Sequence, residues 1–360
     1  MKRKICHMTS AHPWDDVRIF LKECQALAKA GYDVYLVAEG IDREENGVHI
    51  VGCGDKPESR RARMGDFSKL VYEKALALEC DIYHFHDPEL LPYGVKLKEA
   101  GKKVVFDSHE DVSGQILDKE WIPSPFRRLT SYSYKIYETR CVKKFDAVVT
   151  ATPHIAELFS GRAKKVIDIN NFPKLDDIVF NGGHFSKRDA IVCYAGGINE
   201  LRGESVMLEA MKAIDGKLIL AGTYDKNGVC RTKSDNVEYI GWQSRDGINE
   251  LYGKSLLGLV LLLPNPNYVW SRPIKMYEYM AAGLPFVCSD FPLWKEVVEE
   301  SGAGICVPVG DVEAIRKAIN TIINDRKLAQ EMGRRGRKYV LEKYNWQNEE
   351  NKLLQLYKEL

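Results

Sequence analysis

The chain has 360 residues, 52 of them Lys or Arg and 51 Asp or Glu, so its formal charge at pH 7 is +1. This balance gives no overall field that would favour nucleic acid, and the length predicts about two domains of roughly 150 residues each. Nine scattered cysteines without a C-x-x-C pair favour reduced, mostly buried thiols over a disulfide or zinc framework. They are Cys6, Cys24, Cys53, Cys80, Cys141, Cys193, Cys230, Cys288 and Cys306.

The sequence shows neither an export signal nor a membrane span. The basic residues 1–10 are followed by a short strand-like run without a small-residue cleavage site. The longest apolar run, residues 256–263, is far shorter than the roughly 20 residues that a spanning helix needs. We therefore expect a cytoplasmic protein whose membrane contact, if there is one, is peripheral.

Short apolar runs alternate with amphipathic stretches along the whole chain, as buried parallel strands alternate with helices. The runs are residues 4–10, 33–40, 48–53, 81–87, 103–110, 146–153 and 165–171, then 190–197, 217–222, 237–242, 257–264, 284–290 and 304–310. Two such series predict an α/β protein with two doubly wound, Rossmann-like domains. Residues 170–189, rich in Pro, Gly and Asn, mark the boundary, which we place between 1–175 and 176–343. Residues 344–360 form a last helix, in the simplest interpretation a cap on the second domain.

Polar residues are informative where a parallel strand ends, because ligands bind beyond these carboxyl ends. Residues 190–195 run into Gly196-Gly197 and then Arg202. Two glycines allow a close approach to a diphosphate, and Arg202 offers it a bidentate contact. A tight strand-to-helix turn with a surface arginine is the simpler explanation.

The segment SRPIKMYEYMAAGLPFVCSD (271–290) predicts a helix that Ser271 or Arg272 caps and Gly283 ends. Lys275 and Glu278 lie three residues apart near its N-terminus, where free N–H groups and the helix dipole suit phosphate. Glu278 can accept hydrogen bonds from two ribose hydroxyls. The alternative is an ion pair between Lys275 and Glu278 on a solvated helix face.

The string P-I-K-M-Y-E-Y-M-A-A-G-L-P, with Y-A-G-G and the L-V-L-L-L-P strand, resembles the retaining glycosyltransferase family 4 along nearly the whole chain. The resemblance implies the two-domain GT-B architecture with a central cleft, and a final helix (344–360) that crosses back onto the N-terminal domain. It implies that Glu278 matches the second glutamate of the family's E-x7-E motif, which holds the ribose. It also places Gly196, Gly197, Arg202 and Lys275 at the diphosphate. We place Ser271 and Arg272 beside the donor as well.

The chain departs from the family pattern at two positions. The first glutamate of E-x7-E would fall on residue 270, which is Trp270, so the usual contact to the donor sugar is in question. Gly197 stands where an arginine is often found, which leaves the charge of the diphosphate to Arg202 and Lys275.

Histidines and carboxylates follow three strands of the first half, and we expect them to converge on one site. They are His12, Asp15, Asp16 and Arg18; His86, Asp87 and Glu89; and Asp107, His109, Glu110 and Asp111. We place His12, Asp16, His86 and Asp87 on the acceptor or sugar side. The resemblance implies that His109 faces the reacting sugar. Taken singly, such a histidine is more often a structural hydrogen bonder.

These clusters lack diagnostic metal-ligand spacing, and the sequence has no D-x-D motif of metal-dependent sugar transferases. We therefore predict no cofactor and no obligatory metal, with the helix N-terminus and cationic side chains neutralising the leaving diphosphate.

Basic residues gather between 60 and 63 and again between 127 and 144, the second group interleaved with aromatic residues from Trp121 to Tyr137. A solvated helix face with core-facing aromatics is one interpretation. The other is a docking surface for anionic lipid, which would bring a lipid-linked acceptor to the site.

The sequence thus predicts transfer of a sugar from a nucleoside-diphosphate sugar to a hydroxyl of a carbohydrate or lipid-linked glycan, with His109, Arg202 and Lys275 as catalytic residues. The resemblance adds retention of configuration and a role in surface polysaccharide or glycolipid synthesis. Two alternatives are a nucleotide-sugar epimerase of the same architecture and a non-catalytic nucleotide-sugar-binding subunit. A nicotinamide-dependent oxidoreductase is disfavoured, since neither first strand opens into G-x-G-x-x-G.

Overall fold

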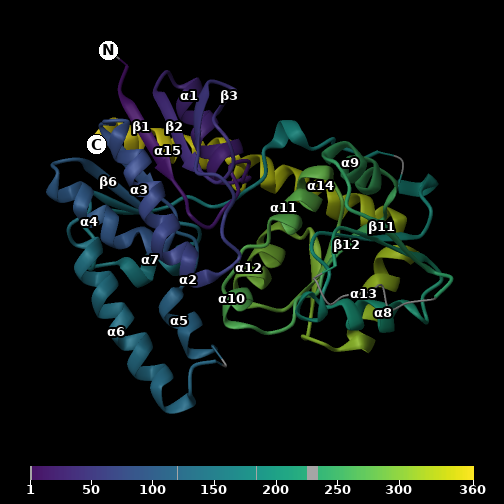
Figure 1. Ribbon diagram of the computed structural model, residues 1–360. Coiled ribbons are helices and arrows are strands. Elements are labelled where there is room, and N and C mark those ends of the chain that lie inside the picture. Colours follow the sequence, from purple (N-terminus) through teal and green to yellow (C-terminus); the bar gives the residue numbers. More distant parts are fainter. Residues whose placement is uncertain (1, 120, 184, 225–233) are drawn as a thin grey trace. The chain divides into compact units, whose positions relative to one another are not determined.

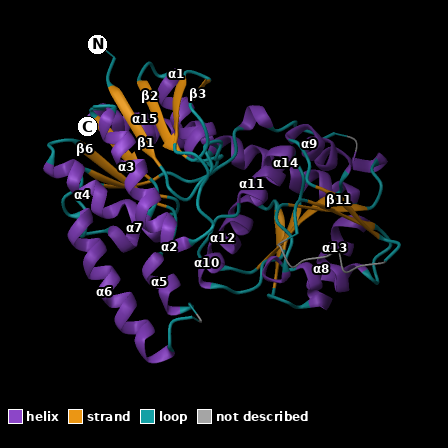
Figure 2. Ribbon diagram, in the orientation of Figure 1, coloured by secondary structure: helices purple, strands orange, loops and turns teal. Residues whose placement is uncertain are grey.

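The computed structural model describes residues 2–119, 121–183, 185–224 and 234–360 (Figure 1). The chain divides into two compact units, Met1–Asn171 with Glu349–Leu360 (unit 1) and Phe172–Asn348 (unit 2). Each unit is an α/β domain with helices on both faces of its own sheet (Figure 2). The two doubly wound domains expected from the sequence are therefore present.

Within the described residues, the sheet of unit 1 has eight strands in the order β3-β4-β2-β1-β5-β6-β7-β8, all parallel except β3. The strands are β1 (Lys4–Met8), β2 (Asp33–Ala38), β3 (Arg43–Glu45), β4 (Val48–Gly52), β5 (Ile82–Phe85), β6 (Lys103–Ser108), β7 (Ala147–Thr150) and β8 (Val166–Asp168). The helices are η1 (Ile19–Cys24), α1 (Gln25–Lys29), α2 (Arg60–Ala62), η2 (Arg63–Phe67), α3 (Ser68–Ala77), η3 (Pro88–Leu90), α4 (Leu91–Glu99), α5 (Val112–Leu117), α6 (Ser124–Val142) and α7 (Pro153–Phe159).

The described part of unit 2 has a six-stranded parallel sheet in the order β11-β10-β9-β12-β13-β14. The strands are β9 (Ile191–Ala195), β10 (Lys217–Ala221), β11 (Val237–Gly241), β12 (Leu257–Val260), β13 (Phe286–Ser289) and β14 (Gly304–Val307). The helices are η4 (Leu175–Asp177), η5 (Phe185–Lys187), η6 (Glu200–Arg202), α8 (Glu204–Met211), α9 (Arg245–Lys254), α10 (Pro266–Val269), α11 (Ile274–Ala282), α12 (Pro292–Ser301), α13 (Val312–Asn324) and α14 (Arg326–Glu342).

Burial on both faces explains why the strands of unit 2 are continuous apolar runs. Alternate residues of a strand point to opposite faces of a sheet. In β9, Cys193 and Ala195 join one core cluster, whereas Val192 and Tyr194 join another. A sheet with a core on each side has no solvated face on which polar residues would alternate.

The predicted strands are all confirmed, but β3 was not predicted. Its three residues, Arg43–Glu45, are charged and exposed, and they pair antiparallel with β4 at the edge of the sheet. Neither apolar alternation nor length marks such a segment in the sequence.

The last helix, α15 (Trp346–Glu359), packs its final residues into unit 1 rather than capping unit 2. Leu353, Leu356 and Tyr357 are fully buried, and the Tyr357 hydroxyl lies 2.8 Å from His84 Nδ1 on β5. The chain thus leaves unit 1 near residue 171 and returns to it from residue 349.

The cysteines agree with the sequence-based expectation. The eight described ones are free thiols, buried except for the half-buried Cys306, and Cys230 lies outside the described residues. No helix among the described residues is long and apolar enough to cross a bilayer.

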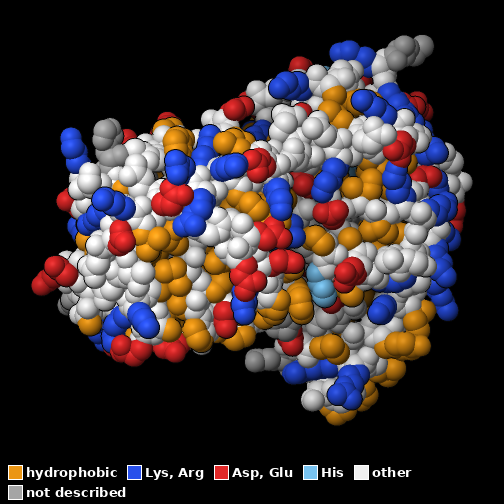
Figure 3. Space-filling model, turned by 180° about the vertical axis from the view of Figure 1, so that it is seen from behind, with side chains coloured by type: hydrophobic (Ala, Val, Ile, Leu, Met, Phe, Trp, Pro, Cys, Tyr) orange, Lys and Arg blue, Asp and Glu red, His pale blue; other side chains and the backbone are white. Residues whose placement is uncertain are grey.

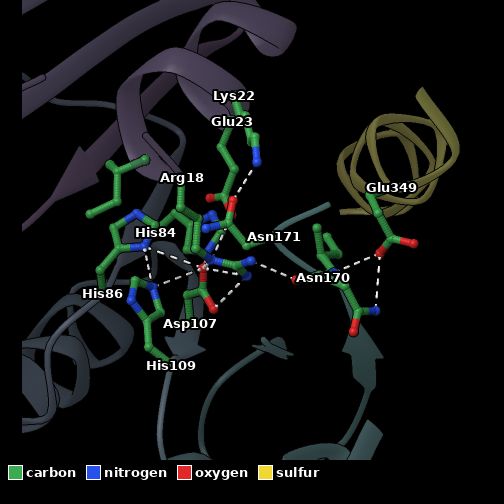
Figure 4. A network of polar contacts seen from close by, with 12 residues as sticks. Arg18, Lys22, Glu23, His84, His86, Asp107, His109, Asn170, Asn171 and Glu349 are labelled. Atoms are coloured by element: carbon green, nitrogen blue, oxygen red, sulfur yellow. Dashed lines mark hydrogen bonds and ion pairs between the residues drawn. The ribbon is translucent and has the colours of Figure 1, made fainter. Parts of the chain in front are cut away.

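A buried ion pair joins the start of η1 to β6 in unit 1 (Figure 4). The Arg18 guanidinium donates from Nε and Nη2 to the two carboxylate oxygens of Asp107, both at 2.9 Å, and from Nη1 to the Ile169 carbonyl. Its Nε also lies 3.2 Å from Glu23. Burial opposes ionisation of Asp107, but Arg18, His109 and His86 together hold the pKa of this carboxyl well below its usual range.

Replacing Arg18 by Met should lower the free energy of unfolding at pH 7 by about 3–5 kcal/mol, because it leaves the Asp107 charge buried without its partner. Adding Asp107→Asn should restore part of the loss, since the uncompensated charge is then removed. Urea unfolding of the single and double variants measures this, and purely additive losses would contradict the pairing.

A carboxyl with a depressed pKa stabilises the fold above its unfolded pKa of about 4. The difference between wild type and Arg18→Met should therefore shrink as the pH falls through the pKa of folded Asp107.

Candidate functional site

The exit of β9 in unit 2 brings together the glycines and the arginine that the sequence singled out. Gly196 has φ +139°, a conformation that residues with a side chain rarely adopt. A Cβ built on Gly196 would lie 3.0 Å from Lys275 Nζ, and one built on Gly197 would lie 3.5 Å from the Arg202 guanidinium. The loop and two cations therefore meet at one point, as a diphosphate site requires.

Arg202 is placed by local structure. It ends η6, where the Asn199 side chain accepts a hydrogen bond from the Arg202 N–H at 2.9 Å. Gly203 follows with φ +83°, where a Cβ would collide with the Leu261 carbonyl at 2.0 Å. The predicted strand-to-helix turn is thus real, and it holds Arg202 beside Gly197.

Lys275 is the most unusual group of unit 2. It is 6% exposed, its ammonium has no hydrogen-bond partner among the described residues, and its Nζ lies 3.8 Å from the centroid of the Tyr194 ring. Burial, and secondarily the charge of Arg202, hold the pKa of Lys275 well below its usual range. A buried ammonium without an anion is costly, so this position is suited to a negatively charged ligand.

Glu278 is anchored by two partners, and neither is Lys275. Its Oε1 lies 2.9 Å from Arg245 Nη2, and its Oε2 accepts a hydrogen bond from the Tyr252 hydroxyl at 3.0 Å. Glu278 as a whole is 8% exposed. The alternative of an ion pair between Lys275 and Glu278 is therefore wrong, and each oxygen keeps acceptor capacity for a ligand hydroxyl.

The expected cap of α11 is also wrong. Its N-cap is Pro273, without a side-chain hydrogen bond, whereas Ser271 Oγ donates to the Tyr268 carbonyl at 2.8 Å. Arg272 lies over the rings of Phe172 and Tyr344, at 5.8 and 5.3 Å from their centroids. The first turn of α11 therefore has no side-chain cap from its N-cap residue.

The predicted end of α11 is confirmed, since Gly283 adopts the left-handed conformation with φ 72°. Trp270, at the position of the missing glutamate, is 42% exposed and directly precedes Ser271.

In unit 1 the three strand exits do converge, because β1, β5 and β6 are neighbours in the sheet. His12 after β1 lies 3.6 Å from Asp87 after β5, measured from Nε2 to Oδ1. His86 Nδ1 lies 3.3 Å from His109 Nε2 after β6. His12 and His109 are also ring neighbours, with centroids 5.1 Å apart.

Most of this cluster is held by structural hydrogen bonds. Asp87 Oδ2 accepts from the Ser10 N–H, the Ala11 N–H and the Thr9 hydroxyl at 2.6–3.2 Å. Asp16 Oδ1 accepts from two backbone N–H groups at the start of η1. Burial lowers the pKa of His12, but Asp16 and Asp87 outweigh it, so its pKa lies above the usual value.

His109 is the partly exposed member of the inner network, with 18% of its side chain accessible. Its Nε2 lies 3.3 Å from Asp107 Oδ2 and 3.3 Å from His86 Nδ1 (Figure 4). Because Nε2 is held inside, Nδ1 is the nitrogen that remains for a substrate. His86 is almost fully buried, and burial keeps its pKa below the usual value, so it orients His109 as a neutral ring.

Two residues next to these sites were missed by the sequence analysis. Arg245 begins α9, 33 positions before Glu278, and only the fold brings the two together. The hydroxyl of Tyr357 on α15 reaches both His84 and His7, and its position 350 residues after His7 gives no local signal.

Two groups in unit 1 have the composition of metal sites. The ligand atoms of His7, Glu23, His84 and His86 lie within 4.8 Å of one another, as do those of His86, Asp107 and His109. Both groups include a carboxylate in contact with Arg18, whose positive charge competes with a metal ion. That the protein needs no metal stays a prediction.

Comparison with known proteins identifies both halves. Residues 17–169 match the model of "Glycosyltransferase Family 4", and residues 177–339 match that of "Glycosyl transferases group 1". An uncharacterized glycosyltransferase of Methanocaldococcus jannaschii is 24% identical over 99% of this chain and 98% of its own length.

Solved structures share the fold. Sucrose-phosphate synthase of Thermosynechococcus elongatus superposes with a TM-score of 0.78 at 18% identity, over 99% of both chains. HepE of Anabaena, solved with UDP-glucose, gives 0.72 at 14% identity over 99% of this chain and 100% of its own. A glycosyltransferase of Rickettsia africae gives 0.74 at 15% identity over 99% and 98%. The chain therefore belongs to the glycosyltransferases of GT-B architecture, with a family 4 first half and a group 1 second half.

Proposed function

We propose that this glycosyltransferase moves a hexose from a nucleoside-diphosphate sugar to an acceptor hydroxyl with retention of configuration, in surface polysaccharide or glycolipid synthesis. One observation carries the donor assignment: the buried Lys275 ammonium has no anionic partner beside the Gly196 loop and Arg202. A diphosphate is the ligand that would neutralise both cations.

The position and partners of Glu278 support a nucleotide as part of the donor. Glu278 lies three residues after Lys275 on α11, on the same side of the helix. Arg245 and Tyr252 hold its carboxylate in place, so it needs little reordering to accept the two hydroxyls of a ribose. Structures of HepE from Anabaena were solved with UDP and with UDP-glucose, which favours a uridine donor for this chain as well.

Catalysis in this proposal depends on positively charged groups that are in position before the reaction begins. As the bond from the sugar to the diphosphate breaks, negative charge grows on the phosphate oxygens. Lys275, Arg202 and the N-terminal turn of α11 stabilise that charge and require no metal. With retention, the acceptor attacks from the face that the diphosphate leaves, and a phosphate oxygen takes the acceptor proton.

His109 is the residue of unit 1 that we assign to the reacting hydroxyl. Its Nε2 is fixed by Asp107 and His86, which leaves Nδ1 for a substrate. His12, the other partly exposed ring of this cluster, lies beside it with Asp16 and Asp87. An acceptor sugar that contacts both rings would be oriented as well as bound.

The membrane contact belongs to the same proposal. A lipid-linked acceptor stays in the bilayer, so the enzyme must reach it as a peripheral protein. The basic residues of α6 and of the segment after it suit an anionic surface.

Replacing Lys275 by Met should weaken UDP-glucose binding by at least about tenfold, which is roughly 1.4 kcal/mol. The same change should raise the thermal midpoint of the ligand-free protein, because it removes an unpaired buried ammonium. Glu278→Gln should weaken binding without that stabilisation. Differential scanning fluorimetry with a panel of UDP-, GDP- and ADP-sugars measures both effects.

Lys295→Ala is the matched control, since Lys295 is an exposed lysine of unit 2 that pairs only loosely with Glu299. It should change neither quantity. Unchanged donor affinity in both Lys275→Met and Glu278→Gln would refute the assignment. Isomerised donor without transfer would point to an epimerase, and binding without any turnover to a non-catalytic subunit.

Donor binding should take up protons. The pKa of Lys275 is depressed in the free protein, and a bound diphosphate raises it because the anion favours the ammonium form. Between these two pKa values binding takes up part of a proton, and affinity falls as the pH rises. Calorimetric titration of UDP-glucose at about pH 8, in buffers of different ionisation enthalpy, measures the uptake. Equal uptake by wild type and Lys275→Met would exclude Lys275 as the source.

A further inference from the structure

Unit 1 contains a cavity of about 410 Å³ that the donor and acceptor groups described above do not use. It lies among η2, η3, α4, α5 and α6, and in Figure 1 α5 and α6 lie side by side at the lower end of the unit. Its size falls in the range of small-molecule sites, about 300–1,000 Å³.

The wall of this cavity is mainly apolar. Met64, Pro92, Val112, Ile116, Trp121 and Tyr137 contribute to it. Trp121 is 71% exposed and Met64 46%, so the apolar wall continues to the surface. A hydrocarbon chain would gain about 25 cal/mol for each Å² of apolar area that it buries here.

The charged residues of the lining favour an anion. Arg60 and Lys119 line the cavity, and Glu89, an acid of the same lining, is already paired with Arg63 at 2.9 Å. An apolar interior with cations in its lining matches the chemistry of an amphipathic anion, such as a lipid phosphate.

The cavity adjoins the acceptor cluster through two short connections. Pro88 and Glu89 line it and directly follow Asp87, and Ser10, which donates to Asp87, also contacts Glu89 at 3.3 Å. Val112 lines it three residues after His109. Two short segments of unit 1 therefore connect the acceptor cluster to the lining of the cavity.

The outer side of α6 continues the same pattern. Phe126, Leu129 and Tyr132 are 58–64% exposed, and with Ile136 they lie on one side of the helix. Arg128, Lys135 and Arg140 are exposed beside this stripe. Figure 3 shows hydrophobic and basic side chains next to one another over the lower end of unit 1. Such a helix face is typical of proteins that lie on anionic bilayers.

We propose that this cavity receives the hydrocarbon chain of a lipid-phosphate-linked acceptor, which the exposed face of α6 meets at an anionic bilayer. The inference rests on the proposed function, because it names the substrate class of the acceptor cluster. The apolar wall holds the chain, Arg60 and Lys119 meet its phosphate, and the sugar hydroxyl extends toward His109.

The first test compares dodecyl phosphate with inorganic phosphate by calorimetric titration of the full chain. Wild type should bind dodecyl phosphate at least about tenfold more tightly, because only the alkyl compound fills the apolar wall. Val112→Phe and Ile116→Phe, which fill the cavity, should abolish this preference. Testing these two variants separately guards against a folding defect in either one, and the thermal midpoint of each must stay near that of the wild type.

Leu129→Ser on the outer stripe is the matched control and should leave dodecyl phosphate binding unchanged. It should instead weaken co-sedimentation with vesicles of phosphatidylcholine and phosphatidylglycerol, to which wild type binds better than to phosphatidylcholine alone. Loss of dodecyl phosphate binding in Leu129→Ser to the same extent as in Val112→Phe would show adsorption to exposed apolar surface and overturn the proposal. Equal binding of the two phosphates, or no dependence on anionic lipid, would overturn it too.

The thermal shift caused by UDP-glucose separates this inference from the proposed function. The cavity variants should keep that shift, because the donor residues lie in unit 2. If wild type shows no shift with any sugar nucleotide while dodecyl phosphate binding still maps to the cavity, the transferase proposal fails and the lipid site remains.

Discussion

The surroundings of a buried cation differ between the two units, and the function that we propose depends on this difference. In unit 1 the Arg18 guanidinium is surrounded by Asp107, Glu23 and a backbone carbonyl, so its charge is balanced within the fold. In unit 2 the Lys275 ammonium is equally buried but meets an aromatic ring and no anion. The first arrangement stabilises the fold, whereas the second lowers its stability until an anion arrives.

This contrast explains which parts of the donor site could be predicted from sequence. Lys275, Glu278 and Gly283 lie within nine residues on one helix, so spacing alone places the first two on one face and ends the helix at the third. Gly196, Gly197 and Arg202 are equally local, since a strand end fixes the turn that follows it. Such short-range features can be predicted from the sequence, because few other backbone conformations are compatible with these residues.

What the sequence did not reveal depends on contacts between distant segments. Arg245 reaches Glu278 only after α9 and α11 have packed beside the same sheet, and no period of the sequence encodes that. Tyr357 meets His84 because α15 returns to unit 1, across 273 residues of chain. The predicted cap of α11 is wrong for a different reason. The Ser271 hydroxyl donates to the nearby carbonyl of Tyr268, and Pro273 is the N-cap of α11. Side-chain competition of this kind is decided by geometry, not by residue type.

The residues of the proposed donor site differ in what they can recognise, and this bears on specificity for the donor sugar. In the proposed site Lys275 and Arg202 would contact phosphate and Glu278 would contact a ribose, and both groups are common to all nucleotide sugars. Trp270 stands where relatives of the family have a glutamate for the sugar, and it offers an aromatic face and an N–H instead of a carboxylate. A tryptophan binds the apolar face of a pyranose ring by stacking and contributes little to reading individual hydroxyls. In the proposed site, electrostatics would therefore select the nucleotide, and we expect groups other than residue 270 to select the sugar.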